Sequence, residues 1–324
     1  MILAAGLSPA WQQIVVLAEL KTGEVNRARD VHWCASGKVL NVGLALHYLA
    51  RTAADGPVRD CKLQFDQTAP PRTLALAGGL TGEAMRREFA GLDVSARWIE
   101  TNSPTRVCTT LLAATTGATT ELVENAQPVA EDELNLFREA YLEEASRAAV
   151  VVLTGSFPAG TPPTLYRDLI IATPGRVVLD AQGAPLLAAL EARPFVVKPN
   201  REELGNTLGH PLEADDQLHA AMRELCRRGA TWVVVSQGKE KVWIGSEREI
   251  MSVGPPKVAV VNPIGSGDCL AAGIATALAK GADVPEAVLT GMAAAADNVG
   301  QLLPARLDAR RVDELRRGLR SSQQ

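Results

Sequence analysis

The 324-residue sequence has no cysteine pairs at close spacing and no long apolar run. Its five cysteines (Cys34, Cys61, Cys108, Cys226 and Cys269) stand apart, without CxxC spacing. An odd, dispersed set argues against a disulfide framework or a zinc site. No stretch reaches the roughly 18 apolar residues of a membrane span, and residues 1–6 carry no basic leader. We therefore expect reduced thiols and a cytoplasmic location.

An excess of positive charge is also missing. The formal charge is −4 and the pI is near 5.7, with lysines and arginines dispersed along the chain. This balance favours neither a nucleic-acid partner nor binding to a membrane surface. The four histidines lack metal-ligand spacing, and no triad-like order is visible, so metal-dependent hydrolysis and acyl transfer are unsupported. Function must come from local sites.

Short aliphatic runs alternate with longer segments of helical spacing. The runs lie at 73–77, 150–153, 176–179, 195–197 and 231–235, and two clear helical segments lie at 131–148 and 214–228. This alternation predicts an α/β fold with a mostly parallel sheet flanked by helices. We expect one domain over residues 1–324, because the length suits a single large core.

Small, polar or charged residues follow these runs. They are Gly78-Gly79, Gly155-Ser156, Asp180, Lys198-Pro199-Asn200, Ser236-Gln237-Gly238 and Gly265-Ser266-Gly267-Asp268. Ligands of open parallel sheets bind beyond the carboxyl ends of the strands, so we expect the six turns to converge on one site. A single turn would mean little, since loops are polar in any case.

Two segments, about 12–34 and 97–124, do not fit the strand–helix alternation. Both are rich in β-formers and carry a plausible turn glycine, so we expect a small separate sheet over the crevice. Such a lid exposes edge strands and could pair in a homodimer. The polar stretch 51–72, with Gly-Pro and Pro-Pro pairs, is predicted to be a long surface loop.

The sequence NPIGSGD at 262–268 joins a strand-like run to a helix expected at about 269–280. Two glycines let backbone N–H groups converge on an anion at the positive end of that helix. Asp268 then either caps the helix, holds a metal or accepts a proton from an attacking hydroxyl. The sequence lacks both GxxxxGK[ST] and an early GxGxxG, which disfavours a P-loop or dinucleotide fold.

Taken in order, the motifs resemble the PfkB group of ribokinase-like carbohydrate kinases, especially 1-phosphofructokinase and tagatose-6-phosphate kinase. The matching segments are 23–27 (GEVNR), 37–42 (GKVLNV), 78–82 (GGLTG), 105–106 (TR), 155–160 (GSFPAG), 198–203 (KPNREE), 235–238 (VSQG) and 262–268 (NPIGSGD). Each is weak alone, but they follow the family's order and spacing over most of the chain. The resemblance implies a ribokinase-like fold with a β-sheet lid.

The resemblance also implies roles for single residues. Asp268 is the implied general base, with Gly265, Ser266 and Gly267 as the anion hole. Asn200 and Glu203 are the implied ligands of Mg²⁺, held through water; in the plainer alternative they form a helix capping box. The implied sugar or sugar-phosphate ligands are Gln12, Gly37, Lys38, Asn41 and Arg106. The implied nucleotide contacts are Lys198, Ser236, Gly238 and Asn298.

Lys38 and Arg106 are the candidates for gripping a phosphate already on the substrate. On this basis we expect a kinase that uses ATP and Mg²⁺ on tagatose-6-phosphate, fructose-1-phosphate or fructose-6-phosphate. A kinase of an unphosphorylated sugar or nucleoside, and a binding protein without turnover, stay open as alternatives.

The sequence departs from the family pattern mostly on the sugar side. Gln12 stands where an aspartate is usual, and Ser36 and Val39 replace glycines around Lys38. Pro263, Ser266 and Lys241 are further departures. Asp268 and its flanking glycines fit the pattern, so the resemblance supports the chemistry better than the identity of the sugar.

Overall fold

Nine strands form the main sheet in a computed structural model, which describes residues 1–51 and 69–321. The strand order is β13-β12-β11-β10-β9-β8-β1-β4-β5, parallel from β11 to β5, with β12 and β13 antiparallel at one edge. The strands are β1 (Ile2–Gly6), β4 (Arg72–Ala77), β5 (Ala96–Glu100), β8 (Val150–Thr154), β9 (Arg176–Asp180), β10 (Val196–Val197), β11 (Trp232–Val235), β12 (Val242–Gly245) and β13 (Ile250–Val253). The predicted mostly parallel sheet is confirmed.

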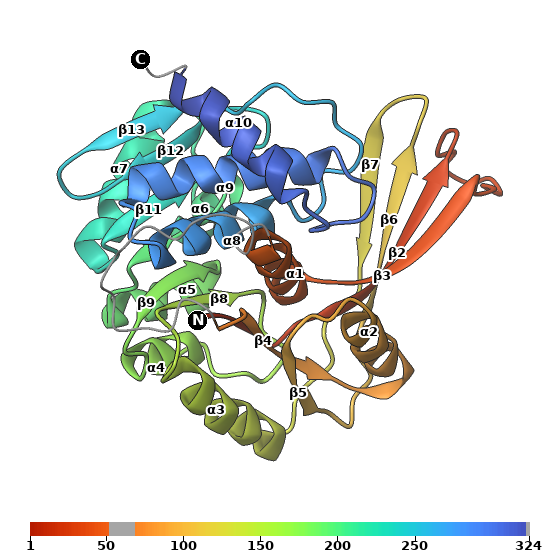
Figure 1. The fold of residues 1–324 in the computed structure, drawn as a ribbon, viewed down its shortest axis with the longest axis horizontal. Helices are drawn as coiled ribbons and strands as arrows, with labels where there is room; N and C mark the ends of the chain where they lie inside the picture. Colours follow the sequence, from red (N-terminus) through yellow and green to blue (C-terminus); the bar gives the residue numbers. More distant parts are fainter. Residues whose placement is uncertain (52–68, 322–324) are drawn as a thin grey trace.

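Helices cover both faces of this sheet (Figure 1). One face packs against α1 (Lys38–Arg51), α2 (Gly79–Gly91), α8 (Ser266–Ala279), α9 (Val284–Val299) and α10 (Ala309–Ser321). The other packs against α3 (Glu131–Ala145), α4 (Leu165–Ile171), α5 (Gly183–Ala189), the 3-10 turn η2 (Leu190–Ala192), α6 (Arg201–Leu208) and α7 (Asp215–Arg228). The two helices expected from periodicity are present, and α3 ends three residues before the predicted boundary.

Alternate residues of each strand enter the two cores. On β1, Leu3 faces the α3 side and Ala4 the α8 side; on β8, Val151 and Val152 divide in the same way. All four are fully buried. Because both faces of the sheet are covered, its strands are continuous aliphatic runs, without the polar alternation of a half-exposed sheet.

Four strands form the separate small sheet, which projects from one side of the main body (Figure 1). They are β2 (Ala10–Leu17), β3 (Asp30–Ser36), β6 (Val107–Ala113) and β7 (Ala118–Val123), in the order β3-β2-β6-β7. The expected lid sheet is therefore present. Its second segment begins at Val107, not at 97, because β5 pairs with β4 in the main sheet and Trp98 packs edge-on against Phe89 of α2.

The predicted loop 51–72 falls mostly outside the described residues. Arg51 ends α1 and Arg72 begins β4, and positions 52–68 lie between them. Among the helices of residues 1–51 and 69–321, none combines the length and apolar character needed to cross a membrane.

Candidate active site

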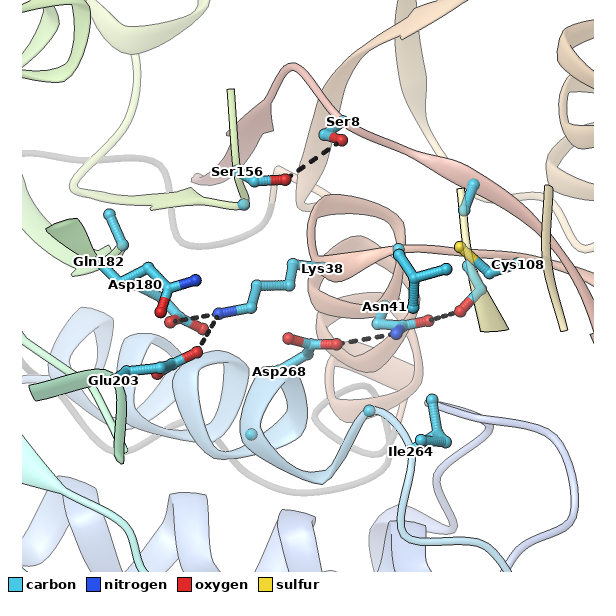
Figure 2. A pocket seen from close by; sticks show the side chains of 18 of the residues that line it. Ser8, Lys38, Asn41, Cys108, Ser156, Asp180, Gln182, Glu203, Ile264 and Asp268 are labelled. Atoms are coloured by element: carbon cyan, nitrogen blue, oxygen red, sulfur yellow. Dashed lines mark hydrogen bonds and ion pairs between the residues drawn. The ribbon is translucent and has the colours of Figure 1, made fainter. Parts of the chain in front are cut away.

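A cavity of about 600 Å³ lies between the carboxyl ends of the main strands and the small sheet. It brings together most residues expected at the site: Gln12, Gly37, Lys38, Asn41, Arg106, Lys198, Asn200, Glu203, Ser236, Gly265, Gly267 and Asp268. Five of the six polar turns therefore converge on one site. Figure 2 shows several of these side chains, with Lys38 and Asp268 at the centre of the group.

The sixth turn, Gly78-Gly79, does not line the cavity. Gly78 approaches the loop at 101–105 so closely that a Cβ there would lie 2.1 Å from the carbonyl oxygen of Ser103. Hydrogen bonds link Gly78 to Thr105 in both directions, since Thr105 N donates to Gly78 O (2.9 Å) and Gly78 N donates to Thr105 Oγ1 (3.2 Å). The turn fixes the segment that leads into Arg106.

The glycine-rich turn presents free backbone donors to the cavity. Gly265 is the N-cap of α8, with a φ of 81° that favours glycine, and α8 begins at Ser266. Among the described residues, the N–H groups of Gly267 and Asp268 have no hydrogen-bond acceptor. Together with the positive end of the helix dipole, these donors suit an anion. Asp268 lies in the first turn of α8, so the capping alternative for its side chain is wrong.

Asp268 is a buried carboxylate with one neutral partner. Its side chain accepts a hydrogen bond from Asn41 Nδ2 at 2.8 Å, and the residue is 6% exposed. Ser36 Oγ donates to Asn41 Oδ1 at 3.1 Å, which turns the amide nitrogen toward Asp268. Burial, and then the nearby charge of Asp180, raise the pKa of Asp268 to about 7. A carboxylate so tuned can accept a proton near neutral pH.

Two lysines and two further carboxylates line the cavity with Asp268. Figure 2 shows three of these four, Lys38, Asp180 and Glu203. Lys38 Nζ lies 3.0 Å from Asp180 Oδ1 and 3.2 Å from Glu203 Oε1. Lys198 Nζ lies 3.3 Å from Asp180 Oδ2. Burial alone would lower the pKa of Lys38, but the carboxylates of Asp180, Glu203 and Asp268 raise it. Burial raises the pKa of Asp180, yet the two lysines outweigh it and hold that pKa low.

The two cations predicted to grip a substrate phosphate are therefore already engaged. Lys38 is ion-paired beside Asp268, not at the small sheet. Arg106 donates to three backbone carbonyls, those of Pro9 (3.3 Å), Ser8 (3.2 Å) and Glu124 (3.0 Å). A guanidinium carries five N–H donors, so Arg106 retains two for a ligand.

Asn200 and Glu203 form the capping box that the plainer alternative describes. Glu203 N donates to Asn200 Oδ1 (2.7 Å), and Asn200 N donates to Glu203 Oε2 (2.9 Å). Both residues still border the cavity, and the Glu203 side chain is 17% exposed. In residues 1–51 and 69–321, no group of three or more His, Cys, Asp or Glu side chains could hold a metal ion. The residues present fit a hydrated cation better than a direct ligand cage.

Three expected residues do not line the cavity: Ser266, Gly238 and Asn298. Asn298 is fully buried; its Nδ2 donates to Ile264 O (2.9 Å) and its Oδ1 accepts from Ala305 N (2.6 Å). The amide thus ties the glycine-rich turn at Ile264 to the backbone at Ala305, and its burial keeps it away from a nucleotide. The nucleotide contact predicted for Asn298 is wrong in this conformation, because burial and the two backbone bonds already use the side chain.

Other lining residues had no predicted role in binding or catalysis, although Gly155, Ser156 and Asp180 belong to turns expected at the site. They are Ser8, Ala10, Ser36, Cys108, Glu121, Val123, Gly155, Ser156, Phe157, Asp180, Ala181, Gln182, Pro185, Pro263 and Ile264. Asp180 had a visible signal, since it ends a buried aliphatic run. For Glu121 the only signal was that side chains alternate between the two faces of β7, and this does not tell which face meets the cavity.

Solved structures of sugar kinases share this fold. Phosphofructokinase-2 from Escherichia coli in complex with fructose-6-phosphate is 25% identical, with 99% of this chain and 100% of that chain covered, at a TM-score of 0.82. The tetrameric inhibited form of the same enzyme is 24% identical (98% and 99% covered, TM-score 0.84). A possible 1-phosphofructokinase from Thermotoga maritima is 19% identical (98% and 97% covered, TM-score 0.84).

The family comparison covers nearly the whole chain. Residues 12–306 match the model for the pfkB family carbohydrate kinases. That span contains all of the small sheet except the first two residues of β2, and it contains the glycine-rich turn with Asp268. The chain belongs to the pfkB family of carbohydrate kinases.

Proposed function

We propose that this kinase transfers the γ-phosphate of ATP to a hydroxyl of a ketohexose phosphate, with Asp268 as general base. One observation carries the proposal: a buried carboxylate whose pKa is raised to about 7 stands beside two unpaired backbone N–H groups at the positive end of α8. A base and an anion site side by side suit attack of a hydroxyl on a phosphoryl group.

Each nearby group has a task in this reaction. Asp268 takes the proton of the attacking hydroxyl, and Asn41 keeps the carboxylate oriented through its 2.8 Å hydrogen bond. The N–H groups of Gly267 and Asp268 stabilise charge on the transferred phosphoryl group. Lys198 Nζ lies close to this turn, 3.6 Å from where a Cβ on Gly267 would stand, and adds positive charge.

Mg²⁺ would shield the negative charge of the ATP phosphates during transfer. Glu203 and Asn200 would hold the hydrated ion through its waters, because their side-chain oxygens already accept hydrogen bonds from the capping box and from Lys38. Ser236 borders the same end of the cavity and would contact the nucleotide.

A phosphorylated substrate is supported by two points. Phosphofructokinase-2 from Escherichia coli, which shares the fold, has been solved with fructose-6-phosphate. Arg106 also retains two N–H donors at the edge of the cavity. An unphosphorylated sugar is the second candidate, since Lys38 is ion-paired with Asp180 and Glu203 and offers the sugar end no charge.

A second copy of the chain would cover the outer face of the small sheet. This face carries Val31, Trp33 and Leu122, which are 42%, 46% and 57% exposed, and Trp33 stacks on Trp11 at 6.2 Å. Apolar side chains grouped on an edge-bearing sheet favour association.

The test is ADP release with Mg-ATP against tagatose-6-phosphate, fructose-1-phosphate, fructose-6-phosphate, free hexoses and nucleosides. Asp268→Asn is measured beside the wild type. We expect turnover of a phosphosugar and its loss in the variant. Turnover of a free sugar alone would establish the second candidate, whereas ligand binding without any turnover would make the chain a binding protein.

A further inference from the structure

Most polar side chains at the small-sheet end of the cavity are paired with one another. Gln12 Nε2 donates to Thr110 Oγ1 at 2.8 Å in a buried contact, and Ser36 Oγ donates to Asn41 Oδ1. The Arg106 guanidinium is held by three carbonyls. These groups shape the wall, but few of them have hydrogen-bonding capacity left for a ligand.

Glu121 is the exception. It lies on β7 directly opposite Thr110 of β6, and Thr110 lies opposite Ile14 of β2. Side chains alternate along a strand, so Glu121 shares the inner face of the sheet with Gln12 and Thr110. Glu121 also lines the cavity. Within residues 1–51 and 69–321, its carboxylate has no hydrogen-bond or ion-pair partner.

The position of Glu121 also separates it from Arg106. Arg106 precedes β6, whereas Thr110, the partner of Glu121, lies four residues further along the chain. A ligand lying along β6 can therefore meet a guanidinium at one end and a carboxylate at the other. Glu121 is an exposed residue, yet partial desolvation at the cavity raises its pKa, and the nearby charge of Arg106 opposes this shift.

We propose that Glu121 is the lid side chain that recognises the sugar, accepting hydrogen bonds from hydroxyls remote from the one that is phosphorylated. The inference rests on the proposed function, because it assumes that the sugar occupies this cavity. An ionised carboxylate is an acceptor only. The substrate part that meets β7 must therefore present free hydroxyls, and any phosphate group lies toward Arg106.

The experiment compares Glu121→Gln with wild type and with Glu139→Gln, an exposed carboxylate on α3. Calorimetry without nucleotide gives the Kd of fructose-6-phosphate and of fructose, and steady-state kinetics give kcat and KM. Glutamine keeps a neutral acceptor and loses the charge, so we expect Kd and KM to rise about tenfold for both sugars with kcat nearly unchanged. Glu139→Gln should change neither.

Equal affinity in wild type and Glu121→Gln would overturn the inference, whatever the turnover. Tighter binding of fructose-6-phosphate alone would also overturn it, because it would place the phosphate against Glu121. If wild type binds these sugars without turning any over, the proposed kinase reaction fails while the Kd values still decide the role of Glu121. If wild type binds neither sugar, both proposals fail.

Discussion

Replacing Asp268 by asparagine should remove activity and stabilise the fold at the same time. The carboxylate is buried, and burial with the neighbouring charge of Asp180 raises its pKa to about 7 from an ordinary value of 3.8. The folded chain therefore binds this proton more tightly than the unfolded chain. The protonated carboxyl of Asp268 therefore contributes to the free energy of unfolding. This contribution is fully present below pH 3.8 and is lost as the pH rises to about 7.

The size of the effect follows from the two pKa values. Between about pH 4 and pH 7 the penalty grows by about 1.4 kcal/mol per pH unit, and above pH 7 it levels at about 4 kcal/mol. The neutral amide of the Asp268→Asn variant would carry no such penalty, and its oxygen can still accept the hydrogen bond from Asn41. The loss of a general base should lower kcat by about 10²- to 10⁴-fold.

Urea unfolding of wild type and Asp268→Asn at pH 5, 6, 7 and 8 measures the difference in free energy of unfolding. We expect the free energy of unfolding of the variant to exceed that of wild type by an amount that grows as the pH rises and is constant above pH 7. A difference in free energy of unfolding that does not change with pH, or that shrinks toward alkaline pH, would show that Asp268 carries no buried charge. Turnover measured on the same samples shows whether the stabilised variant has lost catalysis.

Three further changes test the charges and surfaces around the site. Asp180→Asn removes a negative charge that raises the pKa of Asp268. The acid limb of the kcat/KM profile should therefore shift to lower pH by about one unit. A limb that stays in place or shifts to higher pH would contradict this. Glu203→Gln keeps a residue able to form the capping box, and the Mg²⁺ concentration for half-maximal rate should rise about tenfold if Glu203 orders the ion's waters; an unchanged requirement would exclude that role. Trp33→Lys places a charge on the exposed outer face of the small sheet, and sedimentation should show dimers for wild type and monomers for the variant, whereas a monomeric wild type at micromolar concentration would rule out the proposed dimer.

The fold could be predicted because the main sheet is covered on both faces. Strands such as β8 then consist of consecutive aliphatic residues, a pattern that survives in a single sequence. The boundary of the second lid segment could not be predicted in the same way. β5 (ARWIE) has the length and residue types of a lid strand, and only its pairing with β4 assigns it to the main sheet.

Site residues could be predicted where the chain itself fixes their position. Lys198 directly follows β10, as the strand pattern predicts, whereas Asp268 is placed by the glycine-rich turn that begins α8, and no strand directly precedes that turn. Asp180 and Glu203, 142 and 165 residues from Lys38, were expected at the same site, but their ion pairs with Lys38 could not be predicted because side-chain packing decides which groups pair. Asn298 is the opposite case. Its polar side chain was predicted to contact the nucleotide, but it hydrogen-bonds to the backbone of Ile264 and Ala305 and so has a structural role.

The charges around Asp268 explain why its proton affinity suits the proposed reaction. In the free enzyme, Asp180 and Glu203 contribute two negative charges and Lys38 and Lys198 two positive ones, so the cluster is neutral when Asp268 is protonated. Ionised Asp268 therefore adds one uncompensated charge in a buried place, which is costly. Accepting the hydroxyl proton of a sugar removes that charge. The burial that destabilises the resting carboxylate thus favours the proton transfer, which is why stability and turnover should change in opposite directions in Asp268→Asn.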